Sequence, residues 1–212
     1  MSVLDRFLAQ GDGPVVEYRA LRHLEAKNAH FKASAWMDAW TEYDHTNGFR
    51  FQVVSEGGSG YIRNHVLRVA LDSERKMWAA RDPQKASFTR ENYEFHDRGA
   101  AVEGLTPLGV TPRRKDVLLI DGSIFVHADD GDLRRIEGQL SKAPSIWTRR
   151  VEIVREYERI GGVRVPISIE SVAHVLIAGR STFKMTYQYE SINGQPIGTP
   201  TLTPAPPTSG NR

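Results

Sequence analysis

Histidines are the residues most often used for metal binding and proton transfer, and this chain has seven. None stands in an HxH, HExxH or HxxxH pair with another, so the sequence predicts structural or surface histidines and no metal site. No cysteine is present, which excludes thiol catalysis, cysteine-ligated zinc, iron–sulfur clusters and disulfides. The histidines are His23, His30, His45, His65, His96, His127 and His174.

Two short motifs invite a ligand and are better explained by turns. The run Asp129-Asp130-Gly131-Asp132 is acidic, but it lacks the spacing of an EF-hand loop and the bidentate glutamate that follows one. We interpret it as a solvated hairpin tip. The glycines of residues 57–60 precede a helical pattern without a GxxxxGK[ST] motif, so they predict a hinge between strand and helix and no phosphate site.

Catalytic signatures are not found. No serine stands in a GxSxG motif, and nothing local indicates acyl or phosphoryl transfer. Several glutamates are candidates for paired catalytic carboxylates only by their type, and solvated strand faces explain most of them. The sequence therefore predicts a protein that is not an enzyme and has no cofactor, with a β-rich hydrolase as the third interpretation. The glutamates are Glu91, Glu94, Glu152, Glu156 and Glu158.

Composition indicates an ordinary globular chain. The 212 residues are 40% hydrophobic and 25% charged, with a formal net charge of +2. The basic pairs are short and spread out, so no nucleic-acid partner is expected. No apolar run is long enough to span a membrane. Asp5 and Arg6 interrupt the short apolar start, so no signal peptide is visible, and the protein is either cytoplasmic or has a signal outside this sequence.

Most of the chain alternates apolar and polar residues with a period of two, which is typical of half-buried antiparallel strands. The clearest runs are residues 163–177, 183–190 and 49–53; residues 16–26 follow the pattern although Arg22 interrupts its apolar face. Asn47-Gly48 and Gly161-Gly162 predict hairpin turns. Asp121-Gly122 predicts a turn between two further strands. We expect a meander of about ten strands in one sheet.

Residues 58–81 break this pattern with a helical period of 3.6. We expect Ser59 to cap the helix and Ile62, Val66, Val69 and Met77 to form an apolar stripe. Leu67, Leu71 and Trp78 widen the stripe, and Arg63 and Glu74 project within it. So wide an apolar face favours a concave partner, which a curved sheet supplies. A second, short helix is expected over residues 2–10.

One domain is expected over residues 1–197. Residues 198–212 contain four prolines and few apolar side chains, so they predict a flexible tail.

The order of these segments resembles the LolA-like outer-membrane lipoprotein-sorting family, in a divergent branch, over about residues 15–195. The segments that carry the resemblance are residues 18–26 (YRALRHLEA), 48–59 (GFRFQVVSEGGS), 66–67 with Glu74, 132–138 (DLRRIEG), 144–147 (PSIW), 162–166 (GVRVP) and 185–194 (MTYQYESING). The resemblance implies a mainly β fold with α elements (α+β), a curved antiparallel sheet or incomplete β-barrel wrapped around an amphipathic lid helix. It also implies binding of acyl chains or lipidated proteins between sheet and lid, in the periplasm or at the outer membrane.

The expected function is thus a non-enzymatic carrier of lipid or lipoprotein, peripheral to a membrane at most. Its cavity and lid residues would be Phe51, Val53, Ile62, Arg63, Val66, Val69, Met77, Trp78, Met185 and Tyr187. We expect the helix stripe to point into the concave face near Phe51 and Val53, and Arg63 and Glu74 to face the cavity mouth, where they contact a polar head group or extend to water. In the alternative, the same half-barrel is fully packed and serves as a scaffold in a cell-envelope protein complex.

Overall fold

The computed structural model describes residues 1–202 apart from residues 12, 81–82, 102, 145–147 and 177–178. Most of the predicted tail (residues 203–212), the end of the predicted helix (residue 81) and part of the 144–147 segment therefore lie outside the described residues. The helical elements are α1 (Val3–Ala9), α2 (Gly60–Ile62), the π-helical turn η1 (Arg63–Leu67), α3 (Arg68–Ala80) and the 3-10 turn η2 (Pro83–Ala86). The strands are β1 (Glu17–Asn28), β2 (Ala33–Asp44), β3 (Gly48–Gly58), β4 (Tyr93–Asp97), β5 (Leu105–Pro112), β6 (Ile120–His127), β7 (Leu133–Leu140), β8 (Thr148–Ile160), β9 (Val163–Val175), β10 (Gly179–Ile192) and β11 (Gln195–Pro196).

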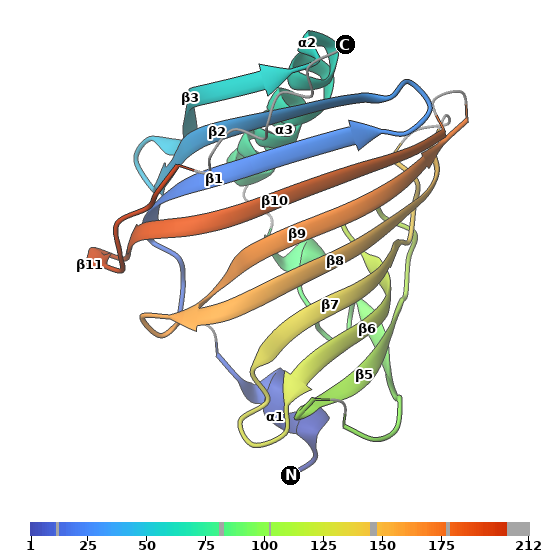
Figure 1. Ribbon diagram of the computed structural model, residues 1–212. Helices are drawn as coiled ribbons and strands as arrows, with labels where there is room; N and C mark the ends of the chain where they lie inside the picture. Colours follow the sequence, from blue (N-terminus) through green and yellow to red (C-terminus); the bar gives the residue numbers. More distant parts are fainter. Residues whose placement is uncertain (12, 81–82, 102, 145–147, 177–178, 203–212) are drawn as a thin grey trace.

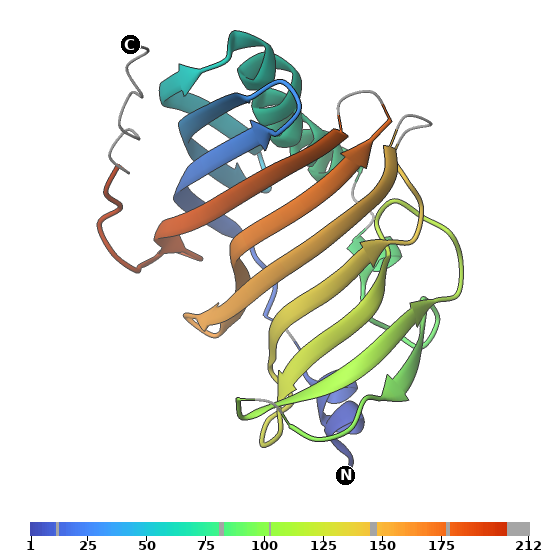
Figure 2. The same cartoon turned by 45° about the vertical axis from the view of Figure 1, so that its right-hand side comes forward.

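These strands form one antiparallel sheet, as the period of two predicts. The order across the sheet is β3-β2-β1-β10-β9-β8-β7-β6-β5-β4, and β11 pairs with β10. The sheet curls strongly, and the helix formed by α2, η1 and α3 lies on the inner side of β1–β3 (Figure 1, Figure 2). Within the described residues β3 and β4 remain edge strands, so the barrel is incomplete. The predicted fold class is confirmed.

Two separate cores lie on the concave side of this sheet. The first core joins β1, β2, β3, β9 and β10 to the helix, and Leu24, Met37, Leu67 and Leu71 are completely buried in it. The second core joins β4–β7 to α1, with Ile124 and Val126 completely buried. β8 runs between the two, and Tyr157, packed against the second core, is the only residue of β8 apart from its last, Ile160, that belongs to or packs against either.

The short α1 forms as expected because it is capped and docked. Ser2 and Asp5 make a capping box, in which the Asp5 amide donates to Ser2 Oγ. Phe7 fills the second core. The turn between β6 and β7 allows this approach, since a Cβ at Gly131 would lie 2.6 Å from the Phe7 nitrogen. The acidic 129–132 run is therefore a hairpin turn, as predicted, on which α1 docks. It is not solvated throughout, because Asp132 is 1% exposed and paired with Arg159.

Asp121-Gly122 does not make the predicted turn, because β6 runs through it without a break. Gly122 pairs with Gly138 of β7, and a Cβ on either residue would meet backbone oxygen of the other strand at 2.1 to 2.4 Å. The two glycines allow β6 and β7 to approach closely where the sheet bends. Gly122 thus marks a place where two strands of the sheet approach closely, and it does not mark a turn.

Candidate functional site

The interface between helix and sheet is filled with side chains. Of the predicted site residues, Ile62, Met185 and Tyr187 are buried in the first core, and Phe51, Val53 and Trp78 are half-buried against it. The structure therefore brings these six together, but as a packed contact between helix and sheet. The described side chains at this interface are therefore packed against one another.

Three predicted residues of the helix stripe point away from this core. Val66, Val69 and Met77 are 37%, 47% and 51% exposed, whereas Leu67 and Leu71 are completely buried. The cause is the π-helical turn Arg63–Leu67, which adds one residue to a turn and rotates the following helix relative to Ile62. The expectation that Val66, Val69 and Met77 face the sheet is wrong.

Arg63 and Glu74 have protein partners in place of the predicted head group. Arg63 Nη1 lies 2.7 Å from Glu56 Oε1 on β3, and Arg68 Nη2 binds the other oxygen of Glu56 at 2.8 Å. These contacts fix one flank of the helix to the edge strand β3. Glu74 lies on the opposite flank and binds Arg22 of β1, which is 1% exposed.

Arg22 is the centre of a buried polar cluster between sheet and helix. Its Nη2 donates to Tyr18 Oη at 2.7 Å and to Glu74 Oε1 at 2.9 Å, and its guanidinium lies 4.5 Å from the Tyr187 ring centroid. Burial alone would raise the pKa of the Glu74 carboxyl, but the Arg22 guanidinium outweighs this and lowers it. Burial raises the pKa of the Tyr18 and Tyr187 hydroxyls, which stay neutral.

The concave face is incompletely covered beyond this cluster, over β8, β9 and β10. Five apolar residues there, which we call the concave strip, are half-buried: Val151, Ile153, Ile169, Ala173 and Phe183. The pairing register places them on the face of the sheet that also carries Met185, because Met185 opposes Ile169, and Phe183 and Ile153 oppose Ser171 from either side. Ser171 and, in the same row of paired residues, Gly138 of β7 and Gly122 of β6 are small, so among the described strand residues little side-chain volume stands on this part of the face.

Sequence reasoning did not select the residues of the concave strip. Ile169, Ala173 and Phe183 lie in runs that were recognised as alternating strands. Their neighbours on β8 depend on the exact register of the β8–β9 hairpin, which an irregularity between Glu156 and Tyr157 shifts. The signal available in the sequence was the alternation of Val151, Ile153, Arg155 and Tyr157 on β8. The first three share the concave face with Ile169 and Ser171.

A serine, an aspartate and a histidine meet on the convex face of β1–β3. His23 Nδ1 lies 2.6 Å from Asp38 Oδ1, and Ser55 Oγ donates to Asp38 Oδ2 at 2.8 Å. The aspartate stands between the other two, so the serine is not hydrogen-bonded to an imidazole base as a Ser-His-Asp nucleophile requires. This arrangement does not support the hydrolase interpretation.

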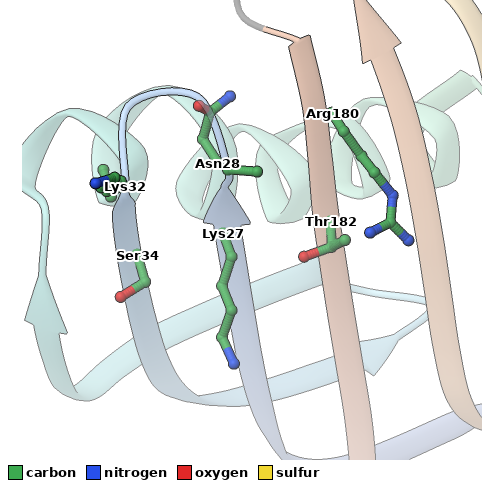
Figure 3. A pocket seen from close by; sticks show the side chains of 8 residues that line it. Lys27, Asn28, Lys32, Ser34, Arg180 and Thr182 are labelled. Carbon is green, nitrogen blue, oxygen red and sulfur yellow. The ribbon is translucent and has the colours of Figure 1, made fainter.

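Two hollows lie on the convex side, where the β1–β2 hairpin approaches the start of β10. The larger, of about 380 Å³, is lined by Lys27, Lys32 and Arg180 together with small polar residues (Figure 3). The second, of about 270 Å³, contains the ion pair between Lys184 and Glu170. Neither is lined by any of the ten predicted site residues. Across the part of the chain that the structure describes, no group of three or more His, Asp or Glu residues is placed to hold a metal ion.

The start of the predicted tail contacts the sheet. The Thr201 amide donates to Gln188 Oε1 at 2.8 Å, and Gln188 Nε2 donates to the Thr201 carbonyl at 3.1 Å. Thr201, in the predicted tail, is thereby held against Gln188 of β10.

No protein-family model matches the chain, and no curated protein does. Among solved structures it is similar to a DUF1329 family protein from Desulfovibrio piger, with 10% identity, 88% of each chain covered and a TM-score of 0.40. It is similar to a LolA superfamily protein from Nitrosomonas europaea, with 7% identity, 89% of this chain and 92% of that chain covered and a TM-score of 0.39. A domain described as an outer membrane lipoprotein-sorting protein, from Vibrio parahaemolyticus, has 12% identity, 91% and 90% coverage and a TM-score of 0.40. Two of these three descriptions name the LolA superfamily or lipoprotein sorting.

Proposed function

We propose that this chain is a non-enzymatic carrier that holds the acyl chain of a lipid or of a lipidated protein against the concave strip. The observation that carries the proposal is the half-buried apolar face over β8–β10, which belongs to neither hydrophobic core at Val151, Ile153 and Ala173. Burial of an acyl chain is favourable by about 0.8 kcal/mol per CH₂ group, so an apolar face with limited contact is sufficient to hold one.

The helix offers a second apolar surface for such a chain. Met77 stands three residues after Glu74, the helix residue that binds Arg22 of β1, and its side chain is 51% exposed. An unbranched thioether side chain adapts to ligands of different shape. A bound chain would therefore have the concave strip on one side and Met77 on the other, and Met77 keeps a ligand-binding role although it does not enter the core.

The proposed compartment is the periplasm or the surface of the outer membrane, where acyl chains need a carrier to cross water. No helix within the described residues is long and apolar enough to span a membrane. Release into or uptake from a bilayer would then occur at its surface. A lipid or a lipidated protein is the proposed partner, and nucleic acid is not.

A second candidate function is that of a scaffold in a cell-envelope assembly. The filled interface between helix and sheet favours it, because Leu24, Leu67 and Leu71 leave no space there for cargo. In this alternative the concave strip contacts another protein.

Binding of a neutral apolar probe separates the two. We expect N-phenyl-1-naphthylamine to bind saturably, with fluorescence enhancement, and hexadecanol to displace it. Native mass spectrometry of the chain purified from a membrane-bearing host should show co-purified lipid. Absence of probe binding together with a stable protein partner would favour the scaffold.

A further inference from the structure

One row of paired residues crosses the concave face from β2 to β5, and Arg155 is the only charged side chain among these eight positions; the row ends on Glu56 of β3 and Asp97 of β4. It runs through neighbouring strands as Met37, Leu24, Met185, Ile169, Arg155, Ile136, Ile124 and Leu108. The first three of these residues belong to the first core and the last three to the second. Arg155 thus stands between the two cores, in the same row as Ile169 of the concave strip and two residues from Ile153.

The Arg155 guanidinium has no carboxylate partner among residues 1–202 as far as they are described. Its one hydrogen bond runs from Nη1 to Tyr157 Oη at 3.3 Å. Nε is shielded from solvent and has no acceptor, so the edge formed by Nε and Nη2 is unused. Arginine stays protonated in proteins, and a shielded cation without an anion is unfavourable.

Glu74, whose charge acts on Arg155 through space, is not bound to it directly. Glu74 uses both carboxylate oxygens on Arg22, at 2.5 and 2.9 Å, and its Oε1 also accepts from Trp78 Nε1 at 3.3 Å. Arg22 is thus bound directly to a carboxylate, whereas Arg155 interacts with the Glu74 charge only through space, without an ion pair or hydrogen bond to it. The concave face therefore offers one guanidinium without a directly bound carboxylate, in the same row as Ile169 of the concave strip.

We propose that Arg155 binds the carboxylate of a long-chain fatty acid, with Nε and Nη2 donating to its two oxygens and the alkyl chain lying along Ile153 and Val151. This assignment rests on the proposed carrier function and specifies its ligand. The unused edge of a guanidinium matches a planar carboxylate in a bidentate pair. A phosphomonoester would bring nearly two negative charges to a site with one free cation, so a carboxylate is the better match.

The experiment compares ligands that differ only in the head group. N-phenyl-1-naphthylamine is displaced from the chain by palmitate, by hexadecanol and by lysophosphatidate. For the unmodified chain we expect the palmitate concentration that displaces half of the probe to be at least tenfold lower than that of hexadecanol. In Arg155→Met these two concentrations should lie within about twofold of each other, since methionine keeps an apolar stem and removes the charge. Arg150→Met, an exposed position on the same strand that pairs with Glu152, is the matched control and should keep the preference.

Each outcome bears on the proposal. Equal displacement by palmitate and hexadecanol, or an unchanged preference in Arg155→Met, would overturn the carboxylate site and leave the carrier function standing. Lysophosphatidate acting well below the palmitate concentration would overturn the choice of carboxylate. Failure of every ligand, including hexadecanol, would overturn the carrier function together with the site. If circular dichroism shows Arg155→Met unfolded, the comparison of head groups on the unmodified chain decides alone.

Discussion

Arg22 of β1 and Glu74 of α3 form a bidentate ion pair across the interface between sheet and helix, with Nη1 to Oε2 at 2.5 Å and Nη2 to Oε1 at 2.9 Å. Each residue is an exception in its own segment, since Arg22 interrupts an apolar strand face and Glu74 an apolar helix arc. The structure shows that the two exceptions are partners. The pair fixes the position of the helix relative to β1.

Glu74→Gln should destabilise the fold strongly. It leaves Arg22, which is almost completely buried, without a compensating charge. Removing one partner of a buried pair costs about 3–5 kcal/mol, and because the Glu74 side chain is 20% exposed we expect about 2–4 kcal/mol. Urea denaturation measures the free energy of unfolding.

Asp72→Asn is the control for this change. It breaks the exposed pair with Arg75 on the same helix and should change the free energy of unfolding by less than about 1 kcal/mol. The double variant Arg22→Met with Glu74→Gln should recover part of the loss, because the uncompensated charge is then gone. A loss in Glu74→Gln no larger than in Asp72→Asn would contradict a structural role for the pair.

The same pair makes stability depend on pH in a predictable direction. The folded-state pKa of Glu74 lies below its ordinary value of 4.5, because Arg22 outweighs the effect of burial. Its contribution is therefore present above about pH 4.5 and is lost as the pH falls through the folded-state pKa. The difference in unfolding free energy between the unmodified chain and Glu74→Gln should be constant near neutral pH and should shrink in acid. A difference that grows below pH 4.5 would contradict this sign. Comparing the two proteins cancels other acidic groups, such as Asp44, whose pKa is lowered first of all by the backbone amide of Asn47.

For the helix formed by α2, η1 and α3, the sequence predicts its existence but not the face that it buries. Its existence follows from a period of 3.6, and the helix is found over residues 60–80 with Ser59 as its capping residue, as predicted. The face that it buries does not follow, because one π-helical turn between Ile62 and Leu67 shifts the register, and a regular period has no means to reveal an added residue.

Leu67→Ala and Val66→Ala test this register with adjacent residues. Leu67 is completely buried, so its truncation should cost about 2–5 kcal/mol. Val66 is 37% exposed, and its truncation should cost less than about 1 kcal/mol. Chemical denaturation of both variants is the measurement, and equal losses would show that the stripe predicted from the sequence also packs.

The sequence was sufficient to predict antiparallel strands, but it did not predict which residues of neighbouring strands pair. Alternation over residues 163–175 is enough to indicate a half-buried strand, and β9 is found there. Gly122 misled the sequence analysis because a glycine that makes a turn and a glycine that lets two strands approach give the same local signal. Arg155 was passed over for a related reason: its position between two cores depends on partners at Ile169 and Ile136, both remote in the chain.

Ser171→Leu should close the site without harming the fold. Ser171 lies on β9 between Phe183 of β10 and Ile153 of β8, and a leucine there would occupy the space that we assign to an acyl chain. We expect affinity for hexadecanol to fall at least tenfold, which corresponds to about 1.4 kcal/mol, with an unchanged or slightly higher melting temperature. Ser168→Leu is the matched control, since Ser168 lies on the opposite face and donates to Glu156. Fluorescent probe displacement and thermal melts of both variants give the answer. An unchanged affinity for hexadecanol in Ser171→Leu would show that the ligand binds away from the concave strip. Equal losses of affinity in both variants would mean that any added bulk on β9 disturbs binding. Only a loss confined to Ser171→Leu supports a carrier whose cargo lies across β8, β9 and β10.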